Sequence, residues 1–159
     1  MERVLPIIVA IADRYSARTV FIRFIPPASP ADAPGQWRPY FERWGIATRQ
    51  SLGSSQLGLV PELARYAPPA TTIDKPAYSA FFRSSLADFL FARHIRTVAI
   101  PGTETDVCVL STVVDAVNIG FRVVIAEDAL CSSSDAGHDA NVSLAFQRTN
   151  QSGQHETVG

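Results

Sequence analysis

Apolar residues along this chain alternate between strand-like and helix-like spacing. Short runs rich in β-branched and aromatic residues predict strands at 19–25, 71–75, 97–100 and 121–126. Apolar positions three and four apart predict helices at 4–16, 59–66, 85–94, 106–120 and 132–144, the second only a short turn. Strands that alternate with helices indicate an α/β fold, a three-layer α/β/α sandwich around a mainly parallel sheet.

Polar residues and glycine mark several helix ends. Pro6 suits the first turn of the first helix, and Ser85 with Asp88 forms a capping-box pattern. Asp106 stands where an N-cap is expected, and Gly120 follows the last apolar position of the same helix.

A proline-rich segment follows the first predicted strand, and we call residues 26–57 the lid segment. Its prolines fall at 26, 27, 30, 34 and 39, and its large aromatic residues are Trp37, Tyr40, Phe41 and Trp44. Long irregular segments within a domain are usually functional or disordered. The aromatic residues favour a packed lid, although they could equally cover a sheet edge.

Composition predicts one globular domain over residues 1–159, with 47% hydrophobic and 18% charged residues. The net charge of −1 gives no basic field for nucleic acid and no polybasic membrane patch. Residues 4–12 resemble a signal peptide, but the run is shorter than the ~20 residues of a membrane span and is better explained as a core-facing helix. Two cysteines form no disulfide framework, so a reducing cytoplasm is expected.

Cys108 has the setting of a nucleophile. It lies in the first turn of the helix that follows the strand at 97–100, at the carboxyl end of a parallel strand. Backbone N–H groups and the positive helix end stabilise a thiolate there, and open α/β sheets bind their ligands at this edge. A buried structural cysteine is the alternative.

Lys75 is a basic residue in an unusual sequence context, at the end of a predicted strand and directly before Pro76.

Histidines at 94, 138 and 155 have no metal-ligand spacing, so no metal site is expected. His94 suits the end of its helix. Gly102-Thr-Glu-Thr-Asp lacks the later glycines of a dinucleotide fingerprint, and there is no phosphate loop, so no cofactor is expected.

Two motifs together resemble the isochorismatase-like cysteine hydrolase family. They are Lys75-Pro-Ala-Tyr-Ser-Ala-Phe81 and Gly102-Thr-Glu-Thr-Asp-Val-Cys-Val109, and the segments 111–116 and 123–129 with His138 fit the same pattern. The resemblance covers roughly residues 4–147. It implies a homo-oligomeric enzyme with an Asp, a Lys and a Cys, which hydrolyses C–N bonds of small amide, ureido or carbamoyl compounds through a thioester.

The resemblance assigns roles residue by residue. Cys108 matches the nucleophile and Lys75 the lysine. The family's cis peptide bond would fall at Thr103–Glu104, and the backbone N–H groups of Glu104 and Cys108 would form the oxyanion hole.

Three features depart from relatives within the family. Residues 23–27 contain no histidine where zinc-dependent nicotinamidases bind metal, and enzymes acting on the isochorismate vinyl ether typically lack the cysteine. The family's aspartate ends a first, central strand, whereas this chain begins at the following helix and Asp13 does not match. We therefore expect a truncated domain that lacks about 25 residues, a central strand and full activity.

Three hypotheses remain from the sequence. The first is a cysteine amidohydrolase whose recorded sequence lacks its start. The second is a non-catalytic relic or interaction module that keeps the scaffold. The third is a redox protein that uses Cys108 and Cys131, which is weakest because a helix and a strand separate the two thiols. The lid segment would select the substrate.

Overall fold

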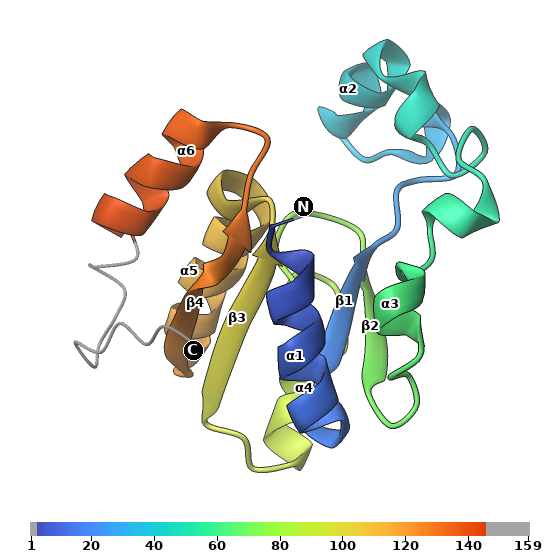
Figure 1. Ribbon diagram of the computed structural model, residues 1–159. Helices are drawn as coiled ribbons and strands as arrows, with labels where there is room; N and C mark the ends of the chain where they lie inside the picture. Colours follow the sequence, from blue (N-terminus) through green and yellow to red (C-terminus); the bar gives the residue numbers. More distant parts are fainter. Residues whose placement is uncertain (1–2, 146–159) are drawn as a thin grey trace.

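The computed structural model describes residues 3–145, and its four strands form two separate parallel sheets. One sheet pairs β1 (Val20–Phe24) with β2 (Thr71–Lys75), and the other pairs β3 (Thr97–Thr103) with β4 (Arg122–Cys131). All four strands end toward the same side of the molecule (Figure 1). The predicted α/β fold with a mainly parallel sheet is confirmed.

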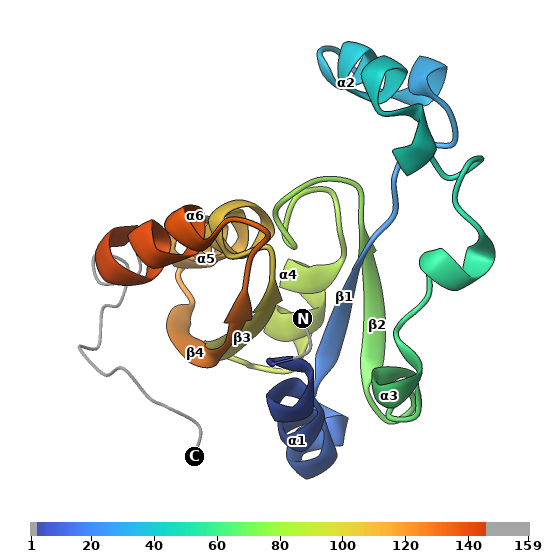
Figure 2. The same ribbon diagram turned by 45° about the horizontal axis from the view of Figure 1, so that its top comes forward.

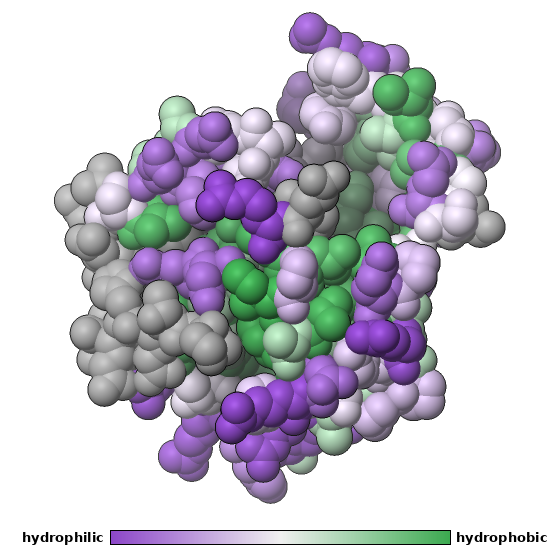
Figure 3. All heavy atoms as spheres, viewed as in Figure 1, coloured by the Kyte–Doolittle hydropathy of each residue, from purple (hydrophilic) through white to green (hydrophobic). Residues whose placement is uncertain are grey.

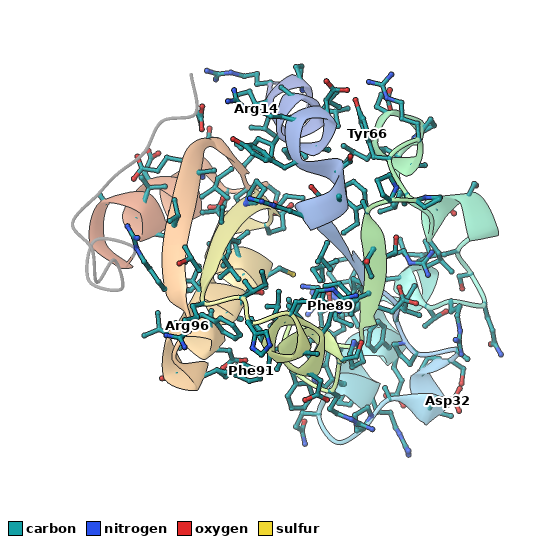
Figure 4. All side chains as sticks on the ribbon, turned by 90° about the horizontal axis from the view of Figure 1, so that it is seen from below. Arg14, Asp32, Tyr66, Phe89, Phe91 and Arg96 are labelled. Atoms are coloured by element: carbon teal, nitrogen blue, oxygen red, sulfur yellow. The ribbon has the colours of Figure 1, made fainter. Side chains whose placement is uncertain are left out.

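Six α-helices accompany the strands in the described residues. They are α1 (Leu5–Tyr15), α2 (Trp37–Arg43), α3 (Pro61–Ala64), α4 (Leu86–Ala92), α5 (Leu110–Ile119) and α6 (Asp135–Ala140). Figure 4 looks along the strands and shows α1, which carries Arg14, on one side of them and α4, which carries Phe89 and Phe91, on the other. In the part of the chain that is described, no helix is both long and apolar enough to cross a membrane.

The larger core cluster holds the C-terminal half together. Val113 and Ala116 of α5 are fully buried and pack with Leu86 and Leu90 of α4 and with the apolar side chains of β4. A smaller cluster joins Ala12 of α1 to β1 and to the start of β2. Burial of these apolar faces accounts for the helix spacing read from the sequence.

The two sheets leave facing edges without partners. In the described residues β1 pairs only with β2, and β3 pairs only with β4. Every residue of β3 is at least partly exposed, although parallel strands are normally buried on both faces. Helix α1 is apolar, yet only Ala12 of it is buried, and an apolar patch is visible on the face where α1 lies (Figure 3). In the described part of the chain, β3 and α1 therefore expose apolar surface.

Several local predictions are wrong. Ser85 makes no capping bond with its side chain; instead Ser84 Oγ accepts from the Leu86 N–H at 3.2 Å. Asp106 is not an N-cap, because the helix begins with a π-helical turn, Thr105–Val109, whose N-cap is Glu104, two residues earlier. The last strand was expected at 121–126, but β4 continues to Cys131. Residues 146–159, including the polar tail from Thr149, lie outside the described residues.

The lid segment projects beyond the ends of β1 and β2 and does not cover a sheet edge (Figure 2). Its α2 helix carries Trp37, Tyr40 and Phe41, whose rings contact one another at 5.1–6.0 Å. Trp44 is 47% exposed and lies outside this cluster. Aromatic packing thus gives the segment a small core of its own, as expected for a packed lid.

Candidate active site

Cys108 is half-buried in the π-helical turn that leads into α5. The wide turn is closed by the Val109 N–H, which donates to the Glu104 carbonyl at 2.9 Å. Thr112 Oγ1 donates to the Cys108 carbonyl at 2.7 Å and accepts from the Ala80 N–H at 3.0 Å. Thr112 thereby ties the cysteine turn to the segment that follows Lys75.

Lys75 is a buried cation at the carboxyl end of β2, only 6% exposed. Its ammonium donates a short hydrogen bond to the Tyr78 carbonyl. Across residues 3–145 the structure gives Lys75 no ion pair with a carboxylate. A buried charge without a counterion is costly. The environment of Lys75 therefore differs from that of most lysines, which are exposed on the surface.

Tyr78 connects the lid segment with the region of Cys108. Its ring contacts Trp37 edge-to-face, with centroids 5.1 Å apart. Burial raises the pKa of the Tyr78 hydroxyl, and the nearby Tyr40 and Cys108 groups raise it further, so the phenol stays neutral. The sequence motif contained Tyr78, but no pattern indicated that its carbonyl accepts from Lys75.

The loop between β3 and the cysteine turn contains a cis peptide bond at Thr103–Glu104, the position that the family resemblance implies. Glu104 Oε2 accepts from the Ser133 N–H and Oγ, both at 2.7 Å, and from Ser132 Oγ at 2.9 Å. Burial opposes the charge of Glu104, but these bonds and one from Thr103 outweigh it and hold its pKa below the usual value. The Glu104 side chain therefore anchors the loop to the end of β4.

Helix α6 fixes the same turn from the other side. The fully buried Thr105 shares a hydrogen bond with His138 Nδ1 at 3.0 Å, and Ser132 donates a short bond to Asp106. A Cβ atom at Gly137 would lie 2.3 Å from Asp106 Oδ2, so α6 can approach this closely only with glycine there. The sequence predicts only a helix start at residues 132–134, and among them Ser134 is the N-cap of α6.

A cavity of about 500 Å³ lies beside Lys75. Pro26, Pro27 and the lid residues Trp37 and Phe41 line it together with Lys75. Among the described residues no group of three or more His, Cys, Asp or Glu side chains could hold a metal ion. Cys108 and Cys131 are both free thiols.

The sequence-predicted residues thus occupy one edge of the molecule. Lys75, Thr103, Glu104 and Cys108 all lie at or just beyond the carboxyl ends of β2 and β3. The hydrogen bonds of Thr112, His138 and Ser133 that hold this edge were not predicted. They join residues 29–33 positions apart in the chain, and no local pattern encodes such contacts.

Comparison with known families gives a match over nearly the whole chain. A family model described as "Isochorismatase domain" matches residues 1–157. A maleamate amidohydrolase from Pseudomonas putida is 30% identical over 110 residues, which cover 65% of this chain and 52% of that protein. A ureidoacrylate amidohydrolase, RutB, from Stutzerimonas stutzeri is 40% identical over 82 residues, covering 52% of this chain and 33% of that protein. The chain therefore spans about half or less of the length of these curated relatives.

Solved structures share the fold. An isochorismatase family protein from Desulfovibrio vulgaris aligns with a TM-score of 0.75 and 22% identity, over 93% of this chain and 76% of that one. At this identity the likeness establishes the architecture and leaves the chemistry to be argued from the site.

Proposed function

Because the chain belongs to the isochorismatase family, we propose that it is built as a cysteine hydrolase that cleaves the C–N bond of a small amide or ureido compound. Support for the reaction class comes from the curated relatives, which are named as amidohydrolases. Support within this chain comes from Lys75 at the carboxyl end of β2 and Cys108 in the turn that follows β3, since parallel strands end at the same edge of the fold.

The proposed reaction has two steps. The Cys108 thiol gives up its proton and the thiolate attacks the carbonyl carbon. The C–N bond then breaks, the same proton passes to the leaving nitrogen, and ammonia or an amine departs, which leaves a thioester on sulfur. Water then hydrolyses the thioester, which releases a carboxylic acid and restores the thiol. Backbone N–H groups of Glu104 and Cys108 would stabilise the oxyanion, at about 3 kcal/mol for each donor.

The observation that carries the proposal is the buried, unpaired cation at Lys75. Within residues 3–145 the buried Lys75 ammonium donates only to the Tyr78 carbonyl, and such a cation favours an anion beside it; we assign that role to the Cys108 thiolate. Thr112 links the two segments directly, because it bonds to both the Cys108 carbonyl and the Ala80 N–H.

The described residues do not supply the general base of the proposed reaction. The resemblance assigns it to an aspartate at the end of a central strand, and Asp13 cannot serve, since it lies in α1 and accepts from the Tyr66 hydroxyl. General acid–base groups typically contribute 10²–10⁴-fold. We therefore propose that this chain by itself turns over amides slowly.

A non-catalytic role is the second candidate. The unpaired edges of β1 and β3 favour it, because such edges pair readily with other chains and lower the stability of an isolated domain. A protein that keeps the scaffold but binds a partner strand would behave in this way.

Ammonia release separates the two candidates. Maleamate and ureidoacrylate are suitable first substrates, tested with the wild type, with Cys108→Ser and with Cys131→Ser as the matched thiol control. The hydrolase proposal predicts slow release that only Cys108→Ser abolishes. It also predicts an increase when an apolar strand ending in Asp precedes residue 1. Equal rates in the wild type and Cys108→Ser would refute it and favour the binding role.

A further inference from the structure

The lid segment is closed on itself by its backbone. The Arg49 N–H donates to the Pro27 carbonyl at 2.9 Å. One residue further on, the Gln50 N–H donates to the Ala28 carbonyl at 3.1 Å, which holds the later part of the segment beside its start. The aromatic cluster of α2 packs around Phe41, which is only 3% exposed. The segment is therefore a small unit with a core of its own, and it projects from the ends of β1 and β2 (Figure 2).

Tyr78 is the aromatic residue that connects this unit with the rest of the molecule. In the part of the chain that is described, it is the one aromatic ring outside the lid segment that contacts the lid cluster, edge-to-face on Trp37 with centroids 5.1 Å apart. Burial raises the pKa of the Tyr78 hydroxyl, and Tyr40 and Cys108 raise it further. The phenol is therefore close enough to a lid residue and to Cys108 to interact with both.

The main chain of Tyr78 holds the buried cation. Its carbonyl accepts the short hydrogen bond from the Lys75 ammonium, which has no carboxylate partner within residues 3–145. Because Lys75 is only 6% exposed, water cannot easily replace this acceptor. The position of the Tyr78 carbonyl therefore fixes where the positive charge lies.

The backbone after Tyr78 is anchored to the cysteine turn. The Ala80 N–H donates to Thr112 Oγ1 at 3.0 Å. The same Thr112 hydroxyl donates to the Cys108 carbonyl at 2.7 Å. The buried Ser79 hydroxyl accepts from the N–H two residues further on at 3.1 Å, which fixes the intervening turn. The chain on this side of Tyr78 is thus held in place, and the lid segment acts on Tyr78 through its ring.

We propose that Tyr78 is a positioning residue that couples the lid segment to the reactivity of Cys108. While Trp37 packs on its ring, the Tyr78 carbonyl holds the Lys75 ammonium at the edge of the fold that carries the cysteine turn. When the lid segment moves away, the ring loses its partner and the carbonyl no longer fixes the cation. Aromatic pairs stabilise a packed arrangement, and a nearby cation favours a thiolate. The inference rests on the proposed hydrolase function and adds to it a control of the nucleophile by the lid segment.

Alkylation of Cys108 by iodoacetamide at neutral pH measures this coupling without turnover. Trp37→Ala removes the lid contact with Tyr78 and should slow alkylation by about two- to tenfold, the range expected for one aromatic pair. Trp44→Ala is the matched control, because Trp44 belongs to the same segment, is 47% exposed and lies outside the cluster. It should leave the rate unchanged. An unchanged or faster rate in Trp37→Ala, or equal slowing in Trp44→Ala, would overturn the proposal.

A double-mutant cycle tests whether the effect passes through the cation. In a Lys75→Met background, Trp37→Ala should cause no further slowing, because no ammonium remains to be released. Slowing by the same factor in both backgrounds would mean that the lid segment acts on Cys108 by another route, and it would refute the proposal.

Variants of Tyr78 itself separate its ring from its hydroxyl. Tyr78→Ala should slow alkylation as Trp37→Ala does, and Tyr78→Phe, which keeps the ring, should restore most of the lost rate. Equal slowing in both Tyr78 variants would assign the effect to the hydroxyl and contradict the proposal. If circular dichroism shows that Tyr78→Ala does not fold, the cycle with Trp37→Ala decides. Ammonia release that does not depend on Cys108 would refute the hydrolase and leave the alkylation result standing.

Discussion

Replacing Gly137 with alanine should loosen the contact between α6 and the cysteine turn. The added Cβ would lie 2.3 Å from Asp106 Oδ2 and 2.9 Å from Asp106 Cγ, whereas real Cβ atoms essentially never approach within 3.0 Å. The two groups must therefore separate by about 0.7 Å or more.

The energetic cost follows from what this separation breaks. If α6 moves, the Thr105–His138 hydrogen bond lengthens from 3.0 Å to about 3.7 Å and is lost. If Asp106 moves instead, its bond from Ser132 is lost. Overpacking destabilises the fold by about 1–3 kcal/mol, and a lost hydrogen bond destabilises it by about 1 kcal/mol. The better helix propensity of alanine stabilises it by about 1 kcal/mol. We expect a net loss of about 1–3 kcal/mol in the free energy of unfolding.

Urea unfolding followed by circular dichroism measures this loss, and Gly45→Ala is the control. A Cβ at Gly45 meets no atom within 4 Å, so that substitution should leave stability unchanged or raise it slightly. Gly137→Ala should also change the rate at which iodoacetamide alkylates Cys108, because Asp106 lies in the same turn. If Gly137→Ala is as stable as Gly45→Ala, the claim that α6 packs closely on Asp106 is refuted.

Three further predictions concern charge and reactivity at the site. Lys75→Met, which keeps the length but removes the buried charge, should slow alkylation of Cys108 near neutral pH, whereas Lys75→Arg should retain part of the rate; equal rates in all three proteins would exclude a role for the cation. Cys108 should react before Cys131 when peptides are mapped by mass spectrometry, because only Cys108 lies at a helix start, and earlier labelling of Cys131 would contradict the assignment. Burial opposes the charge of Glu104, but hydrogen bonds led by those from Ser133 lower its pKa below the usual 4.5, so its carboxylate adds stability above pH 4.5 that is lost as the pH falls through the folded value. The stability advantage of the wild type over Glu104→Gln, measured by urea unfolding, should therefore shrink on acidification from pH 6 to pH 3, and a constant difference would refute the account.

Much of the fold could be predicted because its elements follow local rules. Helix α1 begins with Pro6 near its start, α5 ends at Gly120 with φ of 101°, and β2 occupies the five residues 71–75 that were expected. Each of these depends on spacing or on a residue with a specific backbone preference.

The predictions failed where distant residues compete with local ones. Asp106 is a residue type favoured at N-caps, but its carboxylate accepts a hydrogen bond from Ser132. The helix instead starts with a wide turn that follows Glu104. Ser84 replaces Ser85 at the start of α4, because its hydroxyl also donates to the Ala80 carbonyl.

The central claim is that Cys108 is the nucleophile toward a carbonyl carbon, and the most direct measurement is the mass of the acylated protein. The chain is mixed with p-nitrophenyl acetate, quenched in acid within seconds and digested for peptide mapping. An activated ester needs no proton on its leaving group, so acylation should proceed without the missing base. The account predicts one acetyl group on Cys108, removed by hydroxylamine and absent in Cys108→Ser. Acetylation of Cys131 or Lys75 in its place would contradict the account.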